Sequence, residues 1–190
     1  LSILALLLIW RFGIRFPYIG LVSMERLVQI HLLLTVPLFD AVIINMCAGF
    51  IMPFTNKNYR LDSYKVAVLR GLSNAAMNNF MLLAAGFLLY HYLQLPLTTL
   101  DLRTLLVIVL IAIVIQIINI GMIALYHTID NKDFKKIMNP ALVFADLIFV
   151  PTGVLSALLY QNSDKTLFWL FVFFIFVILL SFNSLQSKDQ

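Results

Sequence analysis

The chain has 190 residues, of which 62% are hydrophobic and 12% are charged, and its formal net charge is +4. With a mean hydropathy of +0.98, it is far more apolar than soluble domains, which are about half apolar and about a quarter charged. A soluble fold of this length could not bury so much apolar surface. The composition therefore excludes an ordinary soluble protein and predicts an all-α, polytopic transmembrane helical bundle in the lipid bilayer. The small positive charge indicates loop orientation and gives no reason to expect a nucleic-acid partner.

The first 26 residues hold a short apolar run and then a segment with frequent helix breakers. Residues 1–10 are too few to cross a bilayer, which takes about 20 residues, so we expect them to be the truncated end of a first span that begins upstream. Residues 11–26 carry Gly13, Pro17 and Gly20 among aromatic and arginine side chains. Glycine and proline at this density break helices, so this segment is expected to form an extended or hairpin-like connection at the membrane surface.

Two long apolar stretches follow. Residues 27–51, which contain Pro37, are expected to form one crossing, and the single cysteine, Cys47, is expected to be a small buried hydrophobic residue there. Residues 71–92 form the next predicted crossing, and its first half is rich in asparagine and small residues. Small residues let helices approach closely, and amides in hydrocarbon need partners on a neighbouring helix. Residues 71–92 are therefore expected to lie inside the bundle.

Three more spans are predicted after a short connection. Thr98 or Asp101 is a candidate N-cap for the fourth helix, because both side chains can accept a hydrogen bond from the first turn. Pro140 is expected to begin the fifth helix, and Pro151 is expected to kink it. The six predicted spans are residues 1–10 (partial), 27–51, 71–92, 102–126, 140–160 and 166–182.

Basic residues in the loops predict the orientation of these spans. Lysine and arginine are enriched in cytoplasmic loops. With six crossings, one side carries Arg11, Arg15, Arg26, Arg103 and Lys165. The other side carries Lys57, Arg60, Lys65, Arg70, Lys132, Lys135, Lys136 and Lys188. The second group is the larger, so we expect its side, and the C-terminus with it, to be cytoplasmic.

Several polar residues are expected near the midplane or in the inner half of the membrane. Ionised carboxylates there cost several kcal/mol unless they are paired or hydrated, so such residues usually face the bundle interior. One interpretation is a relay or ion path through Asp40 and Asp146. The other, which we favour because no buried lysine or arginine is expected as a counter-charge, is a structural clamp of amides. The predicted intramembrane cluster consists of Asp40, Asn45, Asn74, Asn78, Asn79, Gln116, Asn119 and Asp146.

A second group of polar and aromatic residues is expected on the outer side. Aromatic rings with a few cations around an opening suit a small ligand that carries an acidic group. The alternative is the ordinary belt of aromatic and basic residues at the headgroup level. The histidines are too far apart in sequence for a metal motif, no cofactor is indicated, and no catalytic motif is present, so we do not expect an enzyme. The candidate ligand-binding residues are Trp10, Arg11, Arg15, Tyr18, His31, His91 and Arg103, with Tyr90 and Tyr92 beside them.

Four segments, taken in order, resemble a membrane sensory region of bacterial signalling proteins. They read RFPYIGLVSMERLV, VLRGLSNAAMNNFMLLAAGFLLYHYL, IQIINIGMIALYHTIDNKDFKKIM and FVPTGVLSALLYQNSDKTLFWLFVFFIFVILL. In that family the membrane region precedes a cytoplasmic GGDEF, HD-GYP or histidine kinase output domain. The helical arrangement is similar to that of the substrate-binding membrane subunits of energy-coupling-factor transporters. The two acidic residues of the predicted intramembrane cluster, Asp40 and Asp146, match no motif of the family.

The resemblance implies a function and a location. It implies a multi-pass sensor in the inner membrane of a bacterium, which detects a small ligand or a membrane state. The last helix would then pass the change to an output domain expected after residue 190, such as a cyclic-di-GMP enzyme, within a homodimer formed through that helix and the output domain. The alternatives are a substrate-binding subunit of a small-solute transporter and a scaffold that binds other membrane proteins through the small-residue faces Gly71–Ala75 and Gly153–Ala157.

Overall fold

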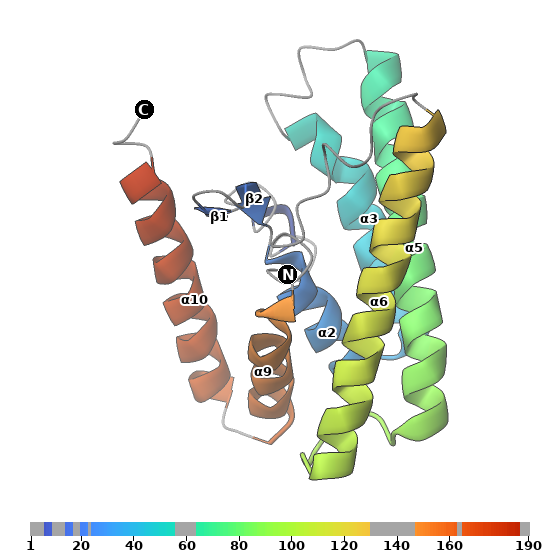
Figure 1. The fold of residues 1–190 in the computed structure, drawn as a ribbon. Coiled ribbons are helices and arrows are strands. Elements are labelled where there is room, and N and C mark those ends of the chain that lie inside the picture. Colours follow the sequence, from blue (N-terminus) through green and yellow to red (C-terminus); the bar gives the residue numbers. More distant parts are fainter. Residues whose placement is uncertain are drawn as a thin grey trace.

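The computed structural model describes residues 6–8, 14–16, 20–22, 24–55, 64–129, 147–162 and 165–186 of the chain. Helices dominate this described part, as the sequence predicts, and a short antiparallel strand pair is the exception (Figure 1). The pair lies within residues 11–26, where a hairpin-like connection is predicted. The elements are β1 (Ile14–Phe16), β2 (Gly20–Val22), α2 (Glu25–Thr35), α3 (Leu38–Thr55), α5 (Tyr64–Tyr92), α6 (Leu102–Ile129), α9 (Val150–Asn162) and α10 (Lys165–Gln186).

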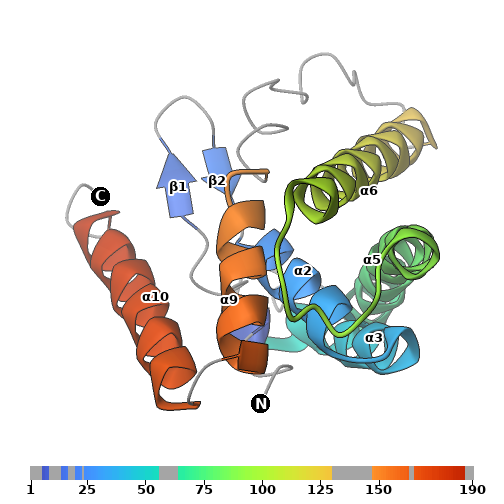
Figure 2. The same ribbon diagram turned by 90° about the horizontal axis from the view of Figure 1, so that it is seen from below.

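Three of the described helices, α3, α5 and α6, are long and apolar enough to cross a membrane. This supports the predicted multi-pass membrane character, although six spans are not shown. α5 packs between α3 and α6, and the three form one side of the molecule (Figures 1 and 2). The helices α2 and α9 have 11 and 13 residues. At a rise of about 1.5 Å per residue, neither reaches across a hydrocarbon core of about 30 Å.

The predicted single helix over residues 27–51 is wrong, because the chain breaks at Pro37. α2 ends at Thr35, and Val36 has the extended angles φ −124° and ψ 160°. Proline disfavours helical geometry in the residue before it and cannot donate the next helical hydrogen bond, so two helices replace one. Arg26 at the start of α2 contacts Met81 in the middle of α5, whereas Leu97 N, beyond the end of α5, donates to Leu34 O.

These contacts show that α2 runs from the middle of α5 towards the connection between α5 and α6. We call this end of the bundle the α5–α6 end. At the same end Leu38 N, in the first residue of α3, donates to the hydroxyl of Tyr90 over 2.9 Å. α3 then runs back along α5, because Gly49 meets Ala75 further up that helix. The chain therefore reverses at Pro37.

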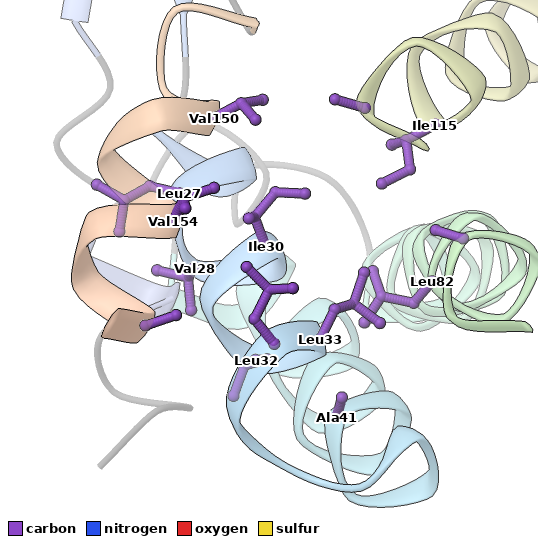
Figure 3. Close-up of a cluster of buried hydrophobic side chains, with 14 of the residues drawn as sticks. Leu27, Val28, Ile30, Leu32, Leu33, Ala41, Leu82, Ile115, Val150 and Val154 are labelled. Atoms are coloured by element: carbon purple, nitrogen blue, oxygen red, sulfur yellow. The ribbon is translucent and has the colours of Figure 1, made fainter. Parts of the chain in front are cut away.

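The short helix α2 is the centre of the hydrophobic core. Nearly all of its residues are buried. Figure 3 shows Ile30 and Leu33 of α2 in the space between α9 on one side and α5 and α6 on the other. An amphipathic stripe would be expected of a helix that packs on one side only. α2 is instead buried around most of its circumference, its polar residues Arg26, Gln29 and Thr35 included, because other helices surround it.

Glycines permit the closest helix contacts. A Cβ atom on Gly153 of α9 would lie 2.7 Å from Leu27 O of α2, and one on Gly71 of α5 would lie 2.7 Å from Phe50 O of α3. Both atoms belong to the facing backbone and cannot rotate away. The two small-residue faces proposed for a scaffold are therefore covered within the chain itself.

The ends of the later helices confirm one prediction and correct another. Asp101 is the N-cap of α6, because Thr104 N donates to Asp101 Oδ1 over 2.7 Å. Hydrogen bonds from the side chain and the backbone N–H of Thr104 lower the pKa of Asp101. Pro151 does not kink a helix within the described residues. It lies in the first turn of α9, where its missing N–H has no helical partner to lose. The predicted helix start at Pro140 lies outside the described residues.

Candidate functional site

The polar interior of the three long helices is made of amides. Asn45 of α3 is fully buried, and Asn78 and Asn79 of α5 and Gln116 of α6 are at least nine-tenths buried. We call these four residues the amide belt. No charged residue belongs to it. Its members come from three of the predicted spans, as the sequence interpretation requires.

Helix register places the amide belt at one depth. Leu38 lies beside Gly86, and Gly49 lies beside Ala75. Asn45 lies between Leu38 and Gly49 on α3, and Asn78 and Asn79 lie between Ala75 and Gly86 on α5. Because α3 and α5 are antiparallel, these three amides lie at the same depth. α5 ends and α6 begins at the α5–α6 end. At a rise of about 1.5 Å per residue, Asn79 and Gln116 each lie about 20 Å from the α5–α6 end, so Gln116 is at the same depth as Asn79.

Four atoms of the amide belt have no hydrogen-bond partner within the described part of the chain. They are both amide atoms of Asn45, Oδ1 of Asn79 and Oε1 of Gln116. Buried polar atoms nearly always have a partner in native proteins, and interhelical hydrogen bonds of such amides help to hold membrane helices together. The unpaired amide atoms of the belt can hydrogen-bond a small neutral polar molecule or an amide of a neighbouring helix. Neither role involves an ionised group.

The other residues of the predicted cluster lie elsewhere. Asp40 is exposed in the first turn of α3 at the α5–α6 end, because the break at Pro37 moves the start of this helix. Its predicted place near the midplane is therefore wrong. Asn74 and Asn119 are only half-buried, and Asn74 lies 4.0 Å from Met52 Sδ. Asp146 lies outside the described residues.

The structure also buries a cation that the sequence interpretation placed in a loop. Arg26, in the first turn of α2, is only 5% exposed. Its Nη1 donates to Gln29 Oε1, and Gln29 Nε2 in turn donates to Glu25 Oε1 over 2.5 Å. Its Nη2 lies 3.8 Å from Met81 Sδ. A buried amide thus links a guanidinium to a carboxylate in the middle of the bundle. The expectation that no buried lysine or arginine is present is wrong.

The predicted outer residues are only partly described. Trp10, Arg11 and Tyr18 lie outside the described residues, and of Arg15 only the backbone is described, paired with Leu21 in the strand pair. His91 is exposed, and its ring meets that of Tyr92 edge to face at 4.7 Å. Arg103 is also exposed, in the first turn of α6.

Arg103 and Tyr92 line one polar hollow of about 550 Å³ at the α5–α6 end. Most of its lining comes from the connection itself, including Thr98, Thr99 and Asp101. The hydroxyl, carboxylate and guanidinium groups there can hydrogen-bond a small polar ligand. Neither His31 nor His91 contributes to this lining, so the structure does not bring all of the predicted outer residues together.

His31 instead belongs to a packed junction of α2, α9 and α10. Its Nδ1 lies 3.0 Å from the hydroxyl of Ser156. Its ring stacks on Phe168 at 5.6 Å and meets Tyr160 edge to face at 5.7 Å. Tyr160 and Phe168 also contact each other. We call these four residues the aromatic junction. It joins the C-terminal helix α10 to the central helix α2.

Sequence interpretation missed Arg26, Gln29, Ser156 and Phe168. The break at Pro37 could have indicated that Arg26 and Gln29 belong to a separate short helix, but not that this helix packs between α9 and α5. Ser156 and Phe168 gave no comparable indication.

The chain matches no protein-family model, no curated protein and no solved structure.

Proposed function

We propose that this chain is a membrane-embedded sensory input region that passes a change in helix packing to a cytoplasmic output domain through α10. The observation that supports this most is the arrangement of the helices in two groups. α3 and α5 are joined by glycine contacts, α6 packs on α5, and the three carry the amide belt, whereas α10 makes its main contacts with α9 and β1 (Figures 1 and 2). α2 connects the groups. A sensor requires two packings with different affinity for the stimulus, and this division provides a surface along which they can differ.

The charge pattern favours the orientation that the proposal needs. The last residues of α3 and α6 and the first residues of α5 lie on the side of the bundle opposite the α5–α6 end. The lysine-rich loops that follow α3 and α6 in sequence start there, and lysine favours the cytoplasm. α10 begins near the α5–α6 end, where α9 meets Thr98, and runs towards the same opposite end (Figure 1). In this orientation α10 would deliver its movement to the cytoplasmic side.

The aromatic junction provides the test. Residues 1–190 are fused to a diguanylate cyclase domain, and cyclic-di-GMP is measured in cells. Phe168→Ala removes the ring that joins α10 to His31 and Tyr160. We expect this change to alter the output at least about fivefold, the lower end of typical coupling between sites. The matched control is Phe87→Ala on α5, because Phe87 is exposed and its loss leaves the α2–α9–α10 contacts intact.

Both variants must reach the membrane in equal amounts, which immunoblotting of isolated membranes checks. An output that stays the same with Phe168→Ala at equal abundance would contradict transmission through α10.

A transporter subunit is the second candidate, because the polar hollow at the α5–α6 end favours a small polar solute. Uptake of labelled solutes into proteoliposomes separates the two candidates. A sensor binds such a solute without accumulating it inside the vesicle.

A further inference from the structure

The polar hollow at the α5–α6 end is lined mainly by residues that both donate and accept hydrogen bonds. Its volume of about 550 Å³ lies within the range of small-ligand pockets. The neutral polar residues of its lining include Tyr92, Gln94, Thr98 and Thr99. Phenol, amide and hydroxyl groups complement the hydroxyls of a ligand, which also donate and accept. The lining therefore suits a molecule that carries several hydroxyls.

Two charged residues line the hollow within the described part of the chain, and they differ in what already binds them. The carboxylate of Asp101 accepts hydrogen bonds from the backbone N–H and the side chain of Thr104. It lies at the start of α6, where the helix dipole offsets a negative charge. The side chain of Arg103 is exposed, and among the described residues its guanidinium has no hydrogen-bond partner. It can therefore donate two parallel hydrogen bonds to a carboxylate.

The lining of the hollow is also tied to α2 and α9. Leu97 N donates to Leu34 O of α2 over 2.9 Å, and Nδ2 of Asn162, the last residue of α9, donates to Thr98 O. Both Leu97 and Thr98 line the hollow. α10 begins at Lys165, shortly after Asn162. A shift of this part of the lining would therefore reach the start of α10 through one hydrogen bond and a short connection.

We propose that the hollow binds a small hydroxy acid, with its carboxylate on Arg103 and its hydroxyls on the neutral polar residues, and that the hydrogen bond between Asn162 and Thr98 couples its occupancy to α10. The coupling rests on the proposed function, because it supplies the stimulus that α10 would transmit, whereas the binding does not. The mostly polar lining gives an acyl chain no apolar wall, so a water-soluble acid fits the hollow better than a lipid.

Calorimetry of the purified 190-residue chain in detergent measures the binding. The probe is gluconate, and its neutral counterpart is sorbitol, in which an alcohol replaces the carboxylate. We expect sorbitol to bind at least about tenfold more weakly than gluconate, the loss of hydrogen bonds between charged groups. Arg103→Gln should weaken the binding of gluconate to the level of sorbitol.

The matched control is Lys165→Gln. Lys165 is also an exposed cation near the α5–α6 end, but it does not line the hollow. Its loss should change the Kd of gluconate by less than about twofold, as remote surface changes do. No binding of gluconate, or equal binding of gluconate and sorbitol, would overturn the proposed site. Equal losses with Arg103→Gln and Lys165→Gln would show general attraction of anions to this end of the bundle and overturn it too.

The fluorescence of Trp169, in α10, measures the coupling on the same chain in a Trp10→Phe background. Saturating gluconate is expected to change the emission of Trp169. Asn162→Ala removes the hydrogen bond to Thr98 and should abolish this change, while gluconate still binds. No change with the native Asn162, or a change that survives Asn162→Ala, would overturn the coupling. Neither measurement uses the fused cyclase, so a failed Phe168→Ala test would count against the proposed function alone.

Discussion

Gly153→Ala is expected to lower the free energy of unfolding by about 1–3 kcal/mol, the usual effect of adding a methylene to a packed core. The added Cβ would lie 2.7 Å from Leu27 O and 3.1 Å from Cβ of Ile30. The first neighbour is a backbone atom in the central helix, so α9 itself must move away from α2. Thermal unfolding of the purified protein in detergent, followed by circular dichroism, measures the loss.

Gly121→Ala is the matched control for this change. Gly121 lies in α6, and a Cβ added there would meet no atom within 4 Å. Alanine is also the better helix former, so this variant should be as stable as the native protein or slightly more stable. Equal midpoints for the two variants would show that α9 does not pack closely on α2.

Arg26→Ala is expected to lower the free energy of unfolding by about 1–3 kcal/mol, because it leaves a buried acceptor without its donor. It leaves Gln29 Oε1 without its donor and opens a cavity beside Met81. Arg26→Lys keeps the charge but loses the planar group that reaches both neighbours, so it should recover only part of the stability. Chemical denaturation in mixed micelles measures both.

The control for Arg26 is Arg103→Ala, since Arg103 is exposed at the start of α6. It should change the free energy of unfolding by less than about 0.5 kcal/mol, as surface substitutions usually do. If Arg26→Ala is no more harmful than Arg103→Ala, Arg26 is not buried in the folded protein.

The sequence predicted those parts of the fold that depend on hydropathy and local chemistry. The long apolar stretches at α5 and α6 became helices, and Asp101 capped α6. Pro37 indicated a helix break, but the apolar sequence that continues on both sides of it favoured a single span over residues 27–51. Hydropathy alone cannot tell a helix surrounded by lipid from one surrounded by protein. α2 belongs to the second kind, because other helices bury most of its residues.

The candidate site was predictable only in its composition. Amides in three apolar segments indicated a buried polar cluster, and the amide belt is one. The depth of each residue depended on where its helix begins, so the break at Pro37 displaced Asp40 from the cluster to the α5–α6 end. Arg26 could not be assigned to the core because the packing of α2 between α9 and α5 depends on contacts distant in sequence.

The chain reverses at Pro37, and the accessibility of single cysteines from the two sides of the membrane measures this reversal. In a Cys47→Ser background, single changes Asp40→Cys, Thr99→Cys and Tyr64→Cys are treated with a membrane-impermeant thiol reagent from either side of the membrane. All three native residues are exposed, Asp40 and Thr99 at the α5–α6 end and Tyr64 at the start of α5. We expect positions 40 and 99 to react from one side of the membrane and position 64 to react from the other. Protection of position 40 from both sides, or its reaction from the same side as position 64, would contradict this reversal.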